Sequence, residues 1–144
     1  MASIKAAQYL APKFMAGDGC GTIYVDTATI AAALAVNDTI EFSVPAGAQV
    51  CGLEIDTDRL DAGAGLTFKA GYKSIAAEPT LATNDSYWGT GLTLARAAGR
   101  TVLAGKPITF NEPVSIFLTV TAIAAGFQAG TVTAVAPANC VGIR

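Results

Sequence analysis

No histidine occurs among the 144 residues of the chain. Imidazole is the side chain that changes charge near neutral pH, and it is the commonest metal ligand in proteins. Its absence therefore excludes a Ser-His-Asp triad, a Cys-His pair and any metal site that needs histidine. Catalysis by lysine, by paired carboxylates or by serine or threonine with lysine stays open. Long apolar runs are missing too, since no window approaches the roughly 18 uninterrupted apolar residues of a membrane-spanning helix.

Charged residues are scarce. They make up 14% of the chain, against about 25% in an average soluble domain, while 52% of the residues are hydrophobic. Either the exterior is an uncharged surface rich in alanine, glycine and threonine, or part of it is buried in an assembly, where interface cores are depleted of charge. The 9 lysines and arginines are scattered, and the net charge is −2. Without a basic cluster to neutralise phosphates, we predict no nucleic-acid partner and no membrane partner.

The cysteines form no recognisable framework. The 3 cysteines are Cys20, Cys51 and Cys140, and an odd, widely spaced set without a Cys-x-x-Cys motif is neither a disulfide scaffold nor a zinc site. We expect reduced thiols that serve as small apolar side chains, which points to a reducing compartment. No targeting segment is expected, because Pro12 and Lys13 interrupt the apolar residues that follow Lys5.

The most regular stretch lies in the middle of the chain. Apolar and polar residues alternate from Thr39 to Val44 and again from Leu66 to Tyr72, which is the period of strands with one face on a core and the other in water. A further strand is predicted between them, from about Val50 to Thr57. Pro45 to Gly47 should end the first strand, because proline donates no ladder hydrogen bond and glycine permits a positive φ. Asp58 to Gly65 is predicted to be a polar loop.

Strands are also predicted on both sides of this stretch. Val114 to Ile123 is apolar on both faces because Phe117 interrupts the alternation, so we predict a central strand there. The other predictions, in chain order, are a strand from Thr22 to Ile30, a connection from Ile30 to Val36 with at most one helical turn, a long irregular loop from Lys73 to Gly91, and a strand from Gly130 to Ala136 that ends at Pro137.

About seven to nine short strands separated by glycine and proline turns predict an all-β fold, and we expect an antiparallel β-sandwich of the jelly-roll type. The length predicts one domain. Gly17 to Gly21 is predicted to be a flexible break. We therefore divide the chain into an N-terminal arm with that break, residues 1–21, which is either extended or a short helix, and a single β-sandwich domain, residues 22–144.

Two segments hold candidate contacts to a partner protein. Apolar side chains in a free arm would be costly in water, so we expect Tyr9, Leu10, Phe14 and Met15 to dock on a neighbour. The alternative is a frayed terminus. In the long loop, Tyr87 and the only tryptophan, Trp88, are either an aromatic anchor in a protein interface or the cap of one end of the core.

Asp56, Asp58 and Asp61 are candidates for a metal site, because several carboxylates could surround a Ca²⁺ ion. Their spacing is not that of an EF-hand loop, and the closing bidentate glutamate is missing. The alternatives are a solvated loop tip and a glycosidase-type carboxylate pair, which would need a cleft with sugar-binding aromatic side chains. We predict no cofactor and no catalytic residue.

Most of the chain, from about Asn37 to Ala136, resembles a known family. The motifs that carry the resemblance are Asp38–Glu41, Val44–Ala48, Leu53–Asp61 and Gly65–Phe68, followed by a long loop and a late Ala-Gly-Thr-Val-Thr stretch at residues 129–133. This succession resembles the head decoration, or cement, proteins of tailed bacteriophages.

The resemblance implies a structural virion protein that is not an enzyme. It would bind the outer surface of a phage capsid and clamp neighbouring subunits of the major capsid protein. Self-association as a homodimer or homotrimer is also implied, as is synthesis in the host cytoplasm. The alternative is a carbohydrate-binding or other ligand-binding sandwich of a phage tail or a secreted protein, which predicts a row of exposed aromatic side chains on one face. A third possibility is an enzyme that uses carboxylates.

Overall fold

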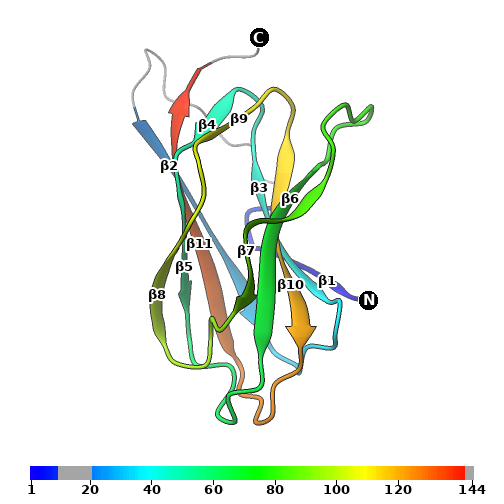
Figure 1. Ribbon diagram of the computed structural model, residues 1–144, viewed down its shortest axis with the longest axis vertical. Helices are drawn as coiled ribbons and strands as arrows, with labels where there is room; N and C mark the ends of the chain where they lie inside the picture. The colour runs from blue at the N-terminus through cyan, green and yellow to red at the C-terminus, as the bar shows by residue number, and fades with distance from the viewer. Residues whose placement is uncertain (10–20, 142–144) are drawn as a thin grey trace.

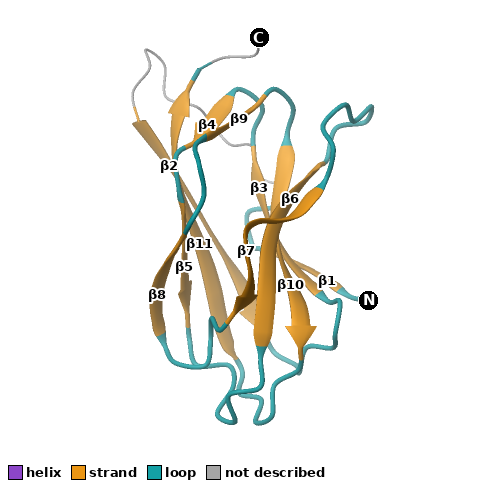
Figure 2. Ribbon diagram, viewed as in Figure 1, coloured by secondary structure: helices purple, strands orange, loops and turns teal. Residues whose placement is uncertain are grey.

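The protein is seen in a computed structural model, which describes residues 1–9 and 21–141. Its regular elements there are strands, and none of the described residues forms a helix that could cross a membrane (Figure 2). In chain order the strands are β1 (Ser3–Lys5), β2 (Gly21–Ile30), β3 (Thr39–Val44), β4 (Ala48–Val50), β5 (Leu53–Thr57), β6 (Thr67–Ser74), β7 (Asn84–Leu92), β8 (Gly99–Leu103), β9 (Ile108–Phe110), β10 (Val114–Ala122) and β11 (Gly130–Cys140).

The strands form two sheets that face each other (Figure 1). In sheet A the order is β1-β3-β10-β6-β7. In sheet B, β11 is central: β2 pairs along one side of it, and β5 and β4 pair in succession along the other side, with β8 and β9 outside them. Among the described strands, every pairing is antiparallel except that of β1 with β3.

The connectivity confirms the predicted jelly roll. β4–β5 and β8–β9 can each be counted as one interrupted strand. The chain from β2 to β11 then passes back and forth between the sheets. The resulting strand orders are β2-β11-β5-β8 in one sheet and β3-β10-β6-β7 in the other. Two four-stranded sheets connected in this way make a jelly roll. Strand β1 is an addition at the edge of sheet A, beside β3.

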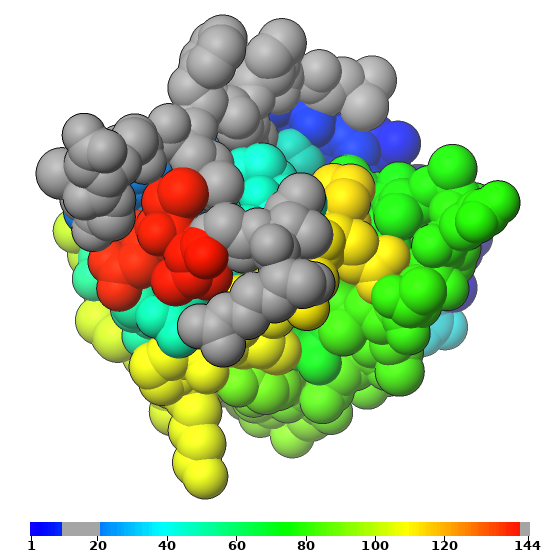
Figure 3. Space-filling model, turned by 90° about the horizontal axis from the view of Figure 1, so that it is seen from above, coloured from blue at the N-terminus to red at the C-terminus, as the bar shows by residue number. Residues whose placement is uncertain are grey.

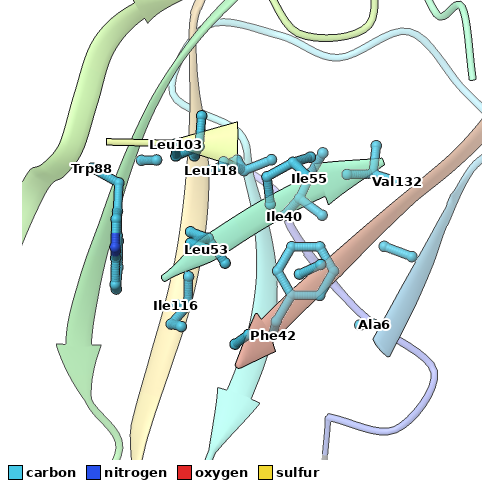
Figure 4. Close-up of a cluster of buried hydrophobic side chains, with 14 of the residues drawn as sticks. Ala6, Ile40, Phe42, Leu53, Ile55, Trp88, Leu103, Ile116, Leu118 and Val132 are labelled. Carbon is cyan, nitrogen blue, oxygen red and sulfur yellow. The ribbon is translucent and has the colours of Figure 1, made fainter. Parts of the chain in front are cut away.

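The core lies between the sheets and follows the alternation of the sequence. Ile40 and Phe42 of β3 meet Leu53 and Ile55 of β5 there, each at most 3% exposed (Figure 4). Burying a side chain of this size contributes about 1.5–3 kcal/mol. Residues 114–120 of β10 are all buried, and β10 lies between β3 and β6, which confirms the predicted central strand.

The irregular loop predicted between Lys73 and Gly91 is only partly a loop. Its second half is β7, and residues 75–83 remain as the connection. Strand β7 pairs with β6 through two register shifts, and its Gly89 and Gly91 have positive φ. Such irregularities remove the period-2 pattern of a strand from the sequence. Strand β7 is therefore recognisable only by its pairing with β6.

Strand β11 also runs past Pro137, where the sequence predicts its end. The carbonyl of Pro137 accepts the N–H of Cys51 at 2.8 Å, on the side of the break between β4 and β5. The N and C=O of one strand residue point to the same neighbour. The missing N–H of Pro137 therefore faces this break, and the proline interrupts no ladder there.

Candidate interaction surfaces

The acidic loop after β5 is held to a second loop by hydrogen bonds to the carboxylate of Asp61. Asp61 is 0% exposed, and its carboxylate accepts N–H hydrogen bonds from Leu66 at 2.6 Å, Gly63 at 2.8 Å and Gly126 at 2.9 Å. Burial would raise the pKa of Asp61, but these backbone donors outweigh it and lower the pKa to about 2. The interpretation of a solvated loop tip is wrong for Asp61, because backbone N–H groups replace the water around its carboxylate.

The other two acidic candidates lie elsewhere. Asp58 accepts hydrogen bonds from N and Oγ1 of Thr131, both at 2.7 Å, and these donors hold the pKa of Asp58 below its usual value. Asp56 lies on the outside of sheet B, in register with Thr133 and Arg100. Within residues 1–9 and 21–141, no group of three or more histidine, cysteine or acidic side chains could hold a metal ion.

Trp88 is 2% exposed and belongs to the buried cluster (Figure 4). Two tyrosine rings lie beside it. Its ring centroid is 5.0 Å from that of Tyr87 and 6.0 Å from that of Tyr72, both edge to face, a favourable geometry for aromatic pairs. The hydroxyl of Tyr87 donates to the carbonyl of Lys106 at 2.9 Å. Of the two interpretations of Trp88, its burial favours the cap of the core, and Tyr87 is half-buried in the same cluster.

Of the candidate contacts in the N-terminal arm, Tyr9 lies in the described part of the chain, whereas Leu10, Phe14 and Met15 lie outside it. The break predicted at residues 17–21 also lies outside it, apart from residue 21. Tyr9 is 7% exposed and covers the outside of sheet A, where its carbonyl accepts Oγ of Ser43 at 2.6 Å. The structure thus places Tyr9 on this chain's own sheet, away from the Trp88 cluster.

A buried carboxylate lies beneath these N-terminal residues. Glu41 of β3 points away from the core, where the sequence predicts contact with water, yet it is 3% exposed. Its carboxylate accepts hydrogen bonds from four side chains: Ser3 and Lys73 at 2.7 Å each, Thr39 at 3.1 Å and Ser115 at 3.4 Å. Burial would raise the pKa of Glu41, but Lys73 and the hydroxyl donors outweigh it and lower the pKa. The expected water-facing side of β3 is therefore covered, and no local pattern indicates this.

The outside of sheet B carries an exposed apolar patch that sequence analysis missed. This sheet-B patch consists of Ile23 and Val25 of β2, Val102 of β8, and Val135 and Pro137 of β11. Val25 pairs with Val135 and Ile23 with Pro137, so the four side chains share one face. Val102 reaches the same face across Glu54. Ile23 is 64%, Val25 48% and Val102 71% exposed.

The charged side chains on the same face as the sheet-B patch are Glu54, Asp56 and Arg100. Thr27 and Thr133 hydrogen-bond to each other at 2.8 Å, and Arg100 is already paired with Glu54 at 3.1 Å. The sequence did hold a signal for the patch. Residues 23–25 and 134–137 are apolar at successive positions, and alternate residues of a strand must point to opposite faces. Some apolar side chains of these two strands therefore had to point away from the core.

A second exposed feature is the projecting loop, residues 75–83 between β6 and β7, which stands out at one side of the end of the sandwich (green in Figure 3). Glu112 holds its base. The carboxylate accepts Oγ of Ser74 at 2.8 Å, N of Thr80 at 3.2 Å and N of Leu81. Leu81 also packs against the core. The projecting loop is therefore anchored at both ends.

Comparison with protein-family models gave no match, and comparison with curated proteins gave none. Two solved structures contain chains of the same fold. One is "Capsid of Ralstonia phage GP4", with a TM-score of 0.69 and 18% identity over 96% of this chain and 97% of that chain. The other is "Cyanophage Pam1 capsid asymmetric unit", with a TM-score of 0.67 and 17% identity over 90% of this chain and 91% of that chain. Since at least 90% of each chain is covered, the similarity joins whole chains of similar length and shows a shared fold.

Proposed function

We propose that this chain is a structural protein of a tailed-phage virion, which binds the outer surface of the capsid and stabilises it by clamping neighbouring major capsid protein subunits. The observation that carries the proposal is the fold. Chains from two phage capsid structures share it over at least 90% of their length and of this one. The sequence resemblance to phage head decoration proteins points the same way. We infer that the protein is a structural component and not an enzyme.

The sheet-B patch is the surface that we assign to contact with the shell. It joins three strands of one face, and three of its side chains are at least 48% exposed. Large exposed apolar patches mark interaction sites, because water is a poor solvent for them. An outward sheet face fits a broad, shallow contact such as the surface of a capsid.

Binding of this kind would act through the assembled state. A protein that binds the assembled shell but not free subunits stabilises the shell by mass action. Each copy that spans two subunits adds a link between them, and many copies on a symmetric lattice hold more tightly than a single contact would. A compact sandwich with its own complete core suits such a role.

The structure gives no specific support to the alternative of a carbohydrate-binding sandwich. That function predicts a row of exposed aromatic side chains. Among the described residues, the exposed large hydrophobic side chains are Met1, Ile23, Val25, Val36, Ile75, Val102 and Ile123, none of which is aromatic. Aliphatic side chains offer packing to a protein surface but no flat ring for a sugar.

The test is the solution mass of the protein by light scattering, alone and with expanded empty phage heads that lack it, followed by co-sedimentation. We expect a discrete oligomer that binds the heads saturably. Val25→Lys and Val102→Lys should each weaken head binding at least about tenfold, because a buried ammonium is costly in an interface core. Both side chains are solvent-exposed, so the free protein should stay folded.

Thr90→Lys is the matched control, since Thr90 is exposed on β7 at the edge of the other sheet. Equal head binding by all three variants would mean that the sheet-B patch is not the surface that contacts the shell. A stable monomer of the parent protein that ignores the heads would reject the proposed function.

A further inference from the structure

Residues 1–9 lie along the outside of the sandwich. Strand β1 pairs in parallel with the edge of β3, with Ser3 opposite Thr39 and Lys5 opposite Glu41. Beyond β1 the chain passes to sheet B, where N of Ala7 donates to the carbonyl of Thr27 at 2.9 Å. The segment therefore bridges the open side of the sandwich between β3 and β2 (Figure 1).

Three buried carboxylates of the body hold this segment. They are Asp38, which accepts N of Ala2 at 2.5 Å; Glu41, which accepts Oγ of Ser3 at 2.7 Å; and Asp26, which accepts N of Gln8 at 2.8 Å. Their exposed fractions are 8%, 3% and 5%. We call these three carboxylates and the edge of β3 the strand-receiving site.

Three side chains of the segment make apolar contacts. Ala6 reaches the core, Ile4 packs against it while partly exposed, and Tyr9 is buried over the outside of sheet A. A permanent element of a sandwich is held mainly by apolar burial. Contacts made mainly by polar and charged groups are more typical of surfaces between separate units. Buried ionic groups also cost desolvation, and their best-attested use is to fix one register and one partner. The strand-receiving site therefore has the chemistry of a docking site for a specific strand.

We infer that the strand-receiving site takes residues 1–9 of a second copy of this chain when copies are held side by side, so that neighbouring copies exchange their N-terminal strands. The contacts are the same whether the strand comes from the same chain or from another, so exchange changes little contact energy. Residues 10–20 connect the strand to β2, and eleven residues can reach up to about 36 Å when extended. The local concentration of copies then decides which strand is bound.

Exchange on the shell rests on the proposed function, because a capsid lattice is what would hold many copies close together. On the capsid, the exchanged strand would link copies of this protein that each bind different capsid subunits. The clamp would then extend from pairs of subunits to a network. In dilute solution each chain would mostly retain its own strand.

Disulfide trapping between chains tests the exchange. Two single variants, Ser3→Cys and Thr39→Cys, are made in a background with Cys20, Cys51 and Cys140 replaced by serine. Ser3 and Thr39 are register partners on the outward side of the β1–β3 pair, and neighbouring strands are close enough for a disulfide. The two variants are expressed separately, one of them in isotopically heavy medium, and are then mixed, bound to heads and oxidised. A covalent heterodimer forms only if Ser3 of one chain lies beside Thr39 of another.

We expect the heterodimer yield to be at least about tenfold higher on heads than in dilute solution. Thr90→Cys in place of Thr39→Cys is the matched control and should give no heterodimer above background. The double variant, Ser3→Cys with Thr39→Cys, checks that the fold is intact. It forms a disulfide within one chain when β1 is bound to β3 of the same chain. Only intrachain disulfides on heads, with no heterodimer, would overturn the exchange. Head binding by the cysteine-free parent is measured separately. Binding without a heterodimer would reject the exchange and leave the proposed function standing, whereas a loss of head binding would reject the proposed function.

Discussion

Asp61 and Glu41 are carboxylates that the fold keeps out of water, and each is compensated in a different way. Asp61 is surrounded by backbone N–H donors from two loops. Glu41 is compensated by Lys73 and by hydroxyl groups from β1, β3 and β10. In both cases the charged form is the one that is hydrogen-bonded, so the native state lowers the pKa.

The first prediction concerns pH. The pKa of Asp61 is about 2 in the folded protein, against 3.8 for an unperturbed carboxyl. A lowered folded pKa contributes stability that is present above the unfolded pKa and is lost as the pH falls through the folded value. Stability should therefore fall between about pH 4 and pH 2. Thermal unfolding followed by circular dichroism at a series of pH values measures this.

Asp61→Asn should lower the melting temperature at neutral pH, because an amide NH₂ would face one of the N–H donors. It should also flatten the loss of stability below about pH 4, since the titrating group is gone. Asp56→Asn, on the outside of sheet B, is the matched control and should leave the acid slope close to that of the parent. An unchanged slope in Asp61→Asn would contradict the assignment.

Among the elements, β7 and the projecting loop depend most on distant residues. Glycine is required at position 71 of β6, because a Cβ there would lie 2.2 Å from the carbonyl oxygen of Asn84 at the start of β7. The loop before β7 is held by Glu112, which follows β9. Neither contact is local, so the shape of this region is set by the sandwich as a whole.

Glu112→Ala should loosen the projecting loop without unfolding the sandwich. The amides of Thr80 and Leu81 lose their acceptor, so their hydrogen exchange should speed up by about tenfold. Amide exchange followed by nuclear magnetic resonance gives the rates. Glu78→Ala removes an exposed carboxylate within the same loop and should leave these rates unchanged. Equal rates in both variants would mean that Glu112 does not hold the loop.

At the scale of the molecule, β10 is the strand on which both the core and the covered outer face depend. It lies between β3 and β6, and residues 114–120 are buried on both of its faces. Leu118 is 0% exposed and lies beside Ile40 and Ala70 in the register of the sheet. A void at this position has no flexible edge nearby to close it.

Leu118→Ala should therefore lower the free energy of unfolding by about 2–5 kcal/mol, the range for a large-to-small change in a packed core. Urea denaturation should show a lower midpoint with an unchanged slope, because the folded state stays compact. Val102→Ala is the control on the exposed sheet-B patch, and it should change stability by less than about 0.5 kcal/mol. Similar losses in both variants would contradict the placement of the core.

Much of the fold was predictable from local patterns. The alternation from Thr39 to Val44 predicted β3, and the two apolar faces of Val114 to Ile123 predicted the central strand β10. The interactions of the site residues were less accessible. Asp61 was expected to face water, and the cover over Glu41 was not foreseen, because both depend on donors from other parts of the chain.

The sequence by itself determined the class of fold, because the alternation of apolar residues is local and sets which face of each strand avoids water. It also determined, through the absence of histidine, which chemistries are excluded. Only the tertiary structure decided that residues 1–9 cover the polar side of β3, that Trp88 is buried, and that Ile23, Val25, Val102, Val135 and Pro137 gather on one face. These outcomes depend on which edges pair and which faces are covered, and such contacts join residues far apart in the chain.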